Sequence, residues 1–355
     1  MLQIILIINI VIGLICVWTR NKGNIVSILI LLFLFLNFAA AQSTLDSYAY
    51  STAFNAIING YSFSEVNNFG FGFDFGFLFV MKIVSLLTSD YLFFRAIIFC
   101  IGIFFIIKSI KMIDNRSIIP ILFYMLFPFA YDTFQIAFFL AYTIVCYGLT
   151  LLIKEKNHCI LKYIIIVIIA SLIHKSALLF LVFLLFKLKL EKFRKMMTIL
   201  VIFFVFVNIF LRVNLVQIVN DSLPFIINIF SAESYVQGNQ LNILTIIMSI
   251  SLNLLLYYYS FCLYKDECCY EYKNLFLINS VSLLFLPFIY VSLDFERLFR
   301  PLLIINYTYI SHTAILKNKK RRLLELIIVL MIIFRFILCW NYLVSNNNDI
   351  LQYIF

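Results

Sequence analysis

The amino-acid sequence predicts an all-α polytopic membrane protein, and three observations lead to this class. Of the 355 residues, 64% are hydrophobic and 12% are charged, whereas soluble chains are about half apolar and about a quarter charged. The mean hydropathy is +1.05. Runs such as 25–36 are apolar almost continuously, while strands of an outer-membrane barrel alternate apolar and polar residues. This composition excludes a disordered chain, a nucleic-acid-binding arm and a secreted disulfide scaffold.

Long apolar runs predict the individual spanning helices. A helix needs about 20 mainly apolar residues to cross the hydrocarbon core, so we expect about 10–12 spanning helices in one domain covering residues 1–355. The clear candidates are 2–18, 25–41, 91–107, 117–131, 134–153, 196–216, 241–264, 274–290, 302–316 and 323–343. Two further stretches, 69–88 and 163–186, are ambiguous, and we expect broken or re-entrant helices there.

Basic clusters predict which loops face the cytoplasm. Lysine and arginine are enriched in cytoplasmic loops, and the densest cluster is 317–322. Counting backward from it, the loop 217–240 lies outside, and the basic stretches 187–195 and 154–162 lie inside. A first external loop covers about 42–74. The net charge of +10 is therefore explained mainly by topology, and we expect no nucleic-acid partner.

The run 163–186 has basic flanks on both sides and is interrupted by His174 and Lys175. One straight span cannot have both of its ends in the cytoplasm. We therefore favour two short helices, 163–173 and 177–186, that meet at His174 in the outer half of the membrane. Eleven residues at about 1.5 Å each reach only about half of the hydrocarbon thickness. The alternative is one tilted span with His174 pointing into the bundle.

The stretch 69–88 raises a question of parity. If the loop after 25–41 is external, an odd number of crossings must join it to the basic residues that follow position 107. The runs 69–88 and 91–107, however, look like two crossings. Either 69–88 is only half-inserted, or one basic loop breaks the positive-inside rule.

Two aspartates in the first external loop are candidates for chemistry. Asp46 and Tyr50 are four residues apart and so share one face of a helix; alternatively, Ser43-x-x-Asp46 is a capping box that closes the helix N-terminus. Asp74 lies in an alternation of Phe and Gly. Flanking glycines let a ligand or another backbone approach closely, and an acid in so apolar a run needs water or a partner. The alternative for Asp74 is a place at the aqueous rim.

Basic residues elsewhere predict an anion-binding site. A lone histidine in an apolar run is usually a core residue, but His174 is followed by Lys175, and two ionisable residues together mark a cavity. Arg297 and Arg300 are three residues apart at the start of a span and share a helical face. Paired guanidinium groups suit a phosphate or diphosphate. A local ion pair with the two acidic residues just before them is the alternative.

Nucleotide and zinc motifs are absent from the sequence. It contains no G-x-x-x-x-G-K-[ST], no G-x-G-x-x-G and no H-E-x-x-H. We therefore expect no cofactor and no metal ion. A reaction carried out by this chain would need a substrate that arrives already activated.

The order of these features resembles one known family. The motifs are Asp46 with Tyr50, Asp74 with Gly76 and Phe77, Gln135 with Ala137, His174 with Ser176 and Ala177, and Arg297 before an aromatic-rich span. In this order they resemble the EpsG/Wzy family of bacterial polysaccharide polymerases, over about residues 40 to 310. The chain departs from the family pattern in three ways: Asp74 stands where glutamate is usual, no arginine lies shortly before Asp46, and none lies near 132–135.

The resemblance implies an O-antigen polymerase of the bacterial inner membrane with a GT-C-like helix bundle. Such a glycosyltransferase joins undecaprenyl-diphosphate-linked repeat units at the outer face and releases undecaprenyl diphosphate. It implies Asp46, Asp74 and His174 as catalytic residues, and Arg297, Arg300, Tyr50 and Gln135 as substrate-binding residues. The expected partners are the lipid-linked oligosaccharide, the lipid bilayer and a chain-length regulator protein.

Two other functions fit parts of the same pattern. A flippase for lipid-linked oligosaccharides should show duplicated halves and basic residues along several spans. An O-antigen ligase should carry arginine and histidine on a large external loop, whereas 217–240 contains neither.

Overall fold

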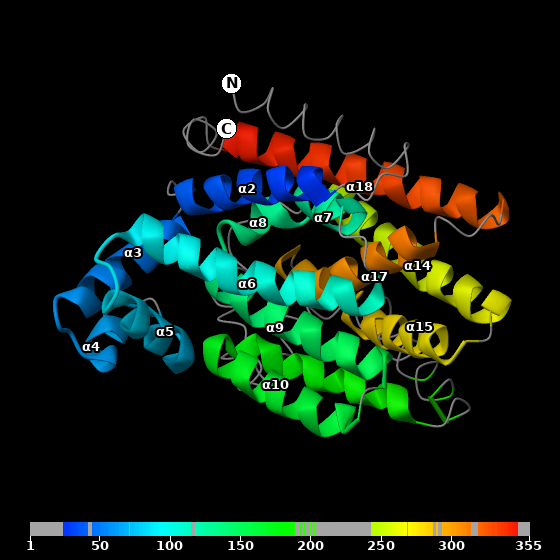
Figure 1. Ribbon diagram of the computed structural model, residues 1–355, viewed down its shortest axis with the longest axis horizontal. Helices are drawn as coiled ribbons and strands as arrows, with labels where there is room; N and C mark the ends of the chain where they lie inside the picture. Colours follow the sequence, from blue (N-terminus) through cyan, green and yellow to red (C-terminus); the bar gives the residue numbers. More distant parts are fainter. Residues whose placement is uncertain are drawn as a thin grey trace.

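Helices make up all the regular structure of the residues that the computed structural model describes (Figure 1). These residues are 24–41, 45–70, 72–114, 118–155, 157–188, 243–267, 269–286, 293–313 and 319–346, with short pieces between 192 and 202 and residue 289. The predicted all-α class is confirmed. The predicted span 2–18 and loop 217–240 lie outside the described residues, as does nearly all of the span 196–216.

The helices follow most of the predicted runs. In the first half of the chain they are α2 (Asn24–Ala40), α3 (Leu45–Ile58), α4 (Phe63–Asn67), α5 (Phe75–Ser85), α6 (Tyr91–Ile113), α7 (Ile118–Leu126), α8 (Phe129–Asp132), α9 (Ile136–Ile153), α10 (Cys159–Ile173) and the 3-10 helix η1 (Lys175–Lys187). In the second half they are α14 (Ile243–Glu267), α15 (Tyr270–Ser282), the 3-10 helices η3 (Leu283–Phe285) and η4 (Leu293–Phe299), α17 (Arg300–Thr313) and α18 (Lys319–Asn346).

Three of the described helices are long and apolar enough to cross a membrane by length and composition: α6, α9 and the segment Leu244–Glu267 of α14. The predicted run 117–131 is divided instead into α7 and α8. The division falls at Pro128, which precedes the first residue of α8. Proline has no backbone N–H to donate within a helix and interrupts it for that reason.

Helix α9 lies at the centre of the bundle. Nearly all its residues are buried, because it is apolar around its whole circumference rather than on one face. It packs against α6, α10 and α17 (Figure 1). Gly148 of α9 permits the close approach of α10, since a Cβ at this position would lie 2.9 Å from the ring of Tyr163.

The run 163–186 forms a hairpin rather than a single span. Helices α10 and η1 meet at His174 and pack against each other. The Tyr163 hydroxyl donates to the Phe180 carbonyl at 2.6 Å, and Lys187, at the far end of η1, forms a salt bridge with Glu155 before α10. The predicted break at His174 is therefore confirmed, and the alternative of one tilted span is wrong. Both arms are longer than predicted and extend alongside α9.

Four of the five buried side chains of η1 recur at every third residue. These four are Ala177, Phe180, Phe183 and Phe186, and the fifth is Ser176. A 3-10 helix has 3.0 residues per turn, so residues three apart lie directly above one another. These four residues thus form a straight buried stripe along one side of η1.

Salt bridges gather the basic loops at one end of the bundle. Lys154 contacts Glu271 at 2.6 Å, and Arg321 contacts Glu267 at 2.8 Å. Together with the pair of Lys187 and Glu155, these contacts bring together the loops after α9, η1 and α14 and the start of α18. We call this end the Lys154 end, and the opposite end the His174 end. The positive-inside rule assigns these basic loops to the cytoplasm. In the structure, their described residues lie together at the Lys154 end.

Helices α5 and α6 both begin at the same end of the bundle. Phe77 of α5 packs edge-on against Phe94 in the first turn of α6, with ring centroids 6.1 Å apart. The eleven residues of α5 rise about 16 Å, and the five residues that return the chain to Tyr91 reach about 18 Å at most. The stretch 69–88 is therefore too short to cross fully and return, which favours the half-inserted alternative.

Candidate active site

The ring of Phe138, in the first turn of α9, gathers three basic side chains. His174 packs edge-on against it with ring centroids 5.3 Å apart. The guanidinium carbons of Arg297 and Arg300 lie 5.4 and 5.6 Å from its centroid, a geometry typical of cation–π contacts. His174 comes from the hairpin turn, Arg297 from η4 and Arg300 from the first residue of α17. Both arginines thus converge on one surface, together with the histidine.

Asp74 joins this group through Lys175. Its Oδ2 accepts a hydrogen bond from the Lys175 backbone N–H at 2.8 Å, and its Oδ1 lies 3.2 Å from Lys175 Nζ. Burial raises the pKa of the Asp74 carboxyl above its ordinary value, while the hydrogen bonds and charge of Lys175 oppose that rise. Asp74 therefore has a partner and a largely buried side chain, while Lys175 itself is exposed.

Gly76 allows α5 to approach α10 at this point. A Cβ at position 76 would lie 2.6 Å from the carbonyl carbon and oxygen of Leu172. These are backbone atoms, so they cannot move aside as a flexible side chain would. Leu172 is two residues before His174, and the contact therefore sets Asp74 beside Lys175. The predicted close approach of a backbone to the Phe/Gly segment is confirmed.

Tyr50 of α3 packs against the residues around Asp74. Its ring stacks on Phe73 at 5.2 Å between centroids and meets Phe77 edge-on at 5.4 Å. Asp46 lies one helical turn before Tyr50, in the first turn of α3, and is half-buried. Ser43, the other member of the predicted capping box, lies outside the described residues. Helix α3 thus places Tyr50 beside the Asp74 segment.

Asp132 holds Arg300 in place, and sequence reasoning did not select it as a site residue. Arg300 Nη1 donates to Asp132 Oδ1 at 2.8 Å. The hydroxyls of Tyr124, at 3.0 Å, and Tyr142 donate to Oδ2. The Asp132 side chain is fully buried, so these three donors replace the water that an exposed carboxylate would bind. Arg300 is fixed by the contact, and one of its donors is occupied.

Glu296 of η4 forms an ion pair with an arginine from another helix. Arg335 of α18 contacts it through two nitrogens, with Nε 3.2 Å from Oε1 and Nη2 bonded to Oε2. Ser249 of α14 also donates to Oε1. The side chain of Asp294 lies outside the described residues. The pair of Glu296 and Arg335 ties η4 to α18 directly beside Arg297.

Gln135 lies at the start of α9, one turn before Phe138, and its side chain makes no capping hydrogen bond. Its Oε1 is buried and has no hydrogen-bond partner among the described residues. A buried acceptor without a donor is destabilising by about 1–3 kcal/mol, and a bound ligand could supply the donor. Gln135 thus lies one turn from Phe138 with an acceptor unpaired within the described part of the chain, and its role as a substrate-binding residue stays a prediction.

Two buried arginines were missed by sequence reasoning. Arg95 in α6 and Arg335 in α18 are 0% and 1% exposed, and each places a charge inside an apolar run. A charge in such a run marks a functional position by default. That signal was available for both residues, but the high average hydropathy of the two runs concealed it.

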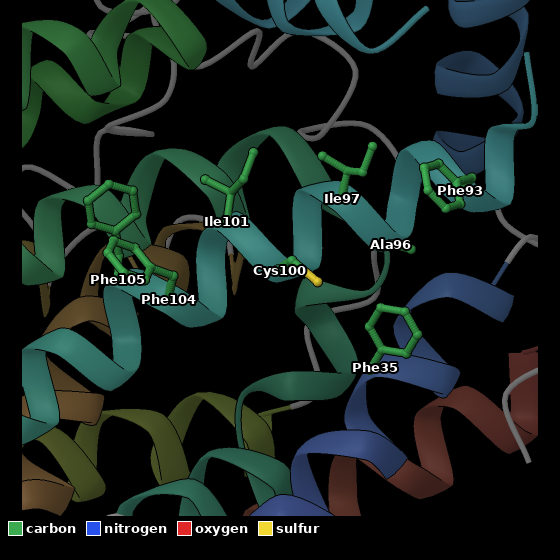
Figure 2. A pocket seen from close by; sticks show the side chains of 8 residues that line it. All are labelled: Phe35, Phe93, Ala96, Ile97, Cys100, Ile101, Phe104 and Phe105. Carbon is green, nitrogen blue, oxygen red and sulfur yellow. The ribbon is translucent and has the colours of Figure 1, made fainter. Parts of the chain in front are cut away.

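An apolar groove of about 580 Å³ lies between α2 and α6 (Figure 2). Phe35 of α2 faces Phe93, Ala96 and Cys100 of α6 across it. Its walls offer hydrocarbon and ring surface with almost no polar atoms. The groove therefore suits a lipid chain rather than a charged headgroup, and we treat it as separate from the polar site.

The fold and the site together define a helical membrane protein with an acidic and cationic centre at one end of the bundle. Comparison with a family model is more specific: the chain belongs to the EpsG family, whose model matches residues 4–355. Members of this family are Wzy-like polysaccharide polymerases. Comparisons with curated proteins and with solved structures gave no match. The family predicted from the sequence is confirmed.

Proposed function

We propose that this chain is an O-antigen polymerase that joins undecaprenyl-diphosphate-linked repeat units at the periplasmic face of the bacterial inner membrane. The observation that carries this proposal is the convergence of Arg297, Arg300 and His174 on Phe138, at the same end of the bundle as Asp74. A cationic surface next to a carboxylate suits a reaction in which a diphosphate departs and a hydroxyl loses its proton.

The proposed reaction is a glycosyl transfer. The acceptor hydroxyl oxygen forms a bond to the anomeric carbon of the donor sugar, while the bond from that carbon to the diphosphate oxygen breaks. Asp74, or Asp46 one turn before Tyr50, accepts the hydroxyl proton. Undecaprenyl diphosphate leaves with the bonding electrons, and Arg297 and Arg300 stabilise its negative charge.

His174 has an orientation suited to contact with a substrate. Its Nδ1 lies 2.7 Å from the Ser176 hydroxyl, so the second ring nitrogen is the one that can meet a ligand. The Phe138 ring holds the imidazole from the side. We propose that His174 hydrogen-bonds the sugar or the diphosphate beside Arg297.

Charge distribution supports the proposed orientation in the membrane. Described basic residues at or near the Lys154 end are Lys111, Lys154, Lys162, Lys187, Lys273, Arg321 and Arg322. Cytoplasmic loops are enriched in such residues. We therefore assign the Lys154 end to the cytoplasm and the His174 end to the periplasm, where lipid-linked repeat units are joined.

The lipopolysaccharide of a strain that lacks this gene tests the proposal. A polymerase mutant should leave lipid A core capped with one repeat unit, and wild-type protein should restore the ladder of long chains. A ligase or flippase mutant would leave bare core. Bare core in the deletion strain would therefore overturn the polymerase assignment and favour one of these two alternatives.

A further inference from the structure

Arg95 connects two distant backbone segments at the His174 end. Its Nε and Nη2 donate to the Phe38 carbonyl at 2.9 and 2.7 Å, and Nη2 also donates to the Thr133 carbonyl at 2.7 Å. Phe38 lies in the last turn of α2, and Thr133 lies between α8 and α9. The guanidinium also lies over the rings of Phe38 and Tyr91, 5.3 and 5.9 Å from their centroids.

The segment that Arg95 holds is the one that carries the partner of Arg300. Thr133 directly follows Asp132, whose carboxylate binds Arg300. Gln135 and then Phe138 come next along the chain. The short turn 132–135 is thus fixed by two buried guanidinium groups: Arg300 binds a side chain, and Arg95 binds the next residue's carbonyl.

We infer that Arg95 is a positioning residue for the reaction, an inference that rests on the proposed function. By fixing Thr133 against α2, it keeps Asp132 in the place where its carboxylate orients Arg300 toward Phe138. Arginine suits this role because its planar fork presents several donors in a fixed geometry, which a lysine ammonium does not reproduce. A purely structural alternative is that Arg95 only satisfies the last carbonyls of α2, as helix ends require.

Substitution of Arg95 by lysine, with glutamine as a second variant in case the first does not fold, separates the two roles. Arg321→Lys is the control, because Arg321 likewise contacts two partners, here the carboxylates of Asp266 and Glu267, but lies at the Lys154 end. The readouts are kcat and KM per folded molecule in proteoliposomes with lipid-linked repeat units, the unfolding temperature, and hydrogen–deuterium exchange of the peptide 129–138.

We expect Arg95→Lys to lower kcat about ten- to a hundredfold, with KM changed less than threefold and an unfolding temperature close to that of Arg321→Lys. Exchange should rise in 129–138 more than elsewhere. In an Asp132→Asn background, the further loss of kcat should be less than threefold, because both changes act through Arg300.

Normal kcat per folded molecule in Arg95→Lys, or fully additive losses in the double variant, would overturn the inference. Failure of the proposed function is a separate result. If wild-type protein forms no polymer, the exchange measurement still decides whether Arg95 fixes the turn, and unchanged exchange in 129–138 would refute that role.

Discussion

Asparagine at position 132 is the sharpest test of how the site is held together. Asp132 is fully buried and accepts hydrogen bonds from Arg300, Tyr124 and Tyr142. Asparagine keeps the shape of the side chain and one carbonyl oxygen but removes the negative charge. Arg300, which is 5% exposed, would then remain in the protein interior without its counter-ion.

The expected loss in the free energy of unfolding is about 3–5 kcal/mol, the usual effect of removing one partner from a buried ion pair. Removing the second charge as well should recover much of this loss, because a buried pair is often replaceable by uncharged groups. We therefore expect the double variant Asp132→Asn with Arg300→Met to be at least about 2 kcal/mol more stable than Asp132→Asn alone. Polymer formation should be slow but still measurable in both variants.

Equilibrium unfolding in detergent, together with a polymerisation assay, measures the two effects separately. Asp90→Asn is the matched control, because Asp90 is an exposed helix cap at the same end and asparagine caps a helix about as well as aspartate. An Asp132→Asn protein within 1 kcal/mol of wild type, or a double variant no more stable than the single one, would refute the ion-pair argument.

Three further substitutions test other parts of the site. Arg297→Lys should lower polymer formation about ten- to a hundredfold at normal protein level, because it removes a charge-assisted hydrogen bond worth about 1.5–3 kcal/mol; a full-length ladder would exclude Arg297 from the site. Gly76→Ala should lower the unfolding temperature and the activity together, because its Cβ would overlap the Leu172 backbone; normal values of both would contradict the described packing. Burial raises the pKa of Asp74, and a base must be ionised to accept a proton. Activity should therefore fall as the pH is lowered through a range above the ordinary aspartate pKa, and Asp74→Asn should be inactive at every pH; an active Asp74→Asn would contradict its role as the base.

Much of the fold could be predicted because its determinants are local. Apolar runs of sufficient length identified α2, α6, α9, α14 and α18, and the basic flanks of 163–186 required the break at His174. The 3-10 geometry of η1 was not predicted, because the segment is apolar at almost every position and the spacing of Phe180, Phe183 and Phe186 at every third residue is a short signal within it. The division of 117–131 had a visible cause in Pro128, which the length criterion alone passed over.

The site was predictable where the sequence places unusual residues in an apolar context. Asp74, His174 and Arg297 stood out for this reason. Arg95 carries the same signal, but its contacts and those of Asp132 could not be predicted, because they involve partners 57 and 168 residues away in the chain. Sequence spacing alone does not reveal which distant side chains the tertiary fold will bring together.

The 3-10 form of η1 determines how far the hairpin can reach. Its 13 residues rise about 26 Å at about 2.0 Å each, whereas the same residues in an α-helix would rise about 20 Å. The difference is about one helical turn. Helix α10, the other arm of the hairpin, rises about 22 Å over its 15 residues and ends at His174. The 3-10 arm therefore returns the chain from His174 to Lys187, beside Glu155, over a comparable length with two residues fewer than α10 uses.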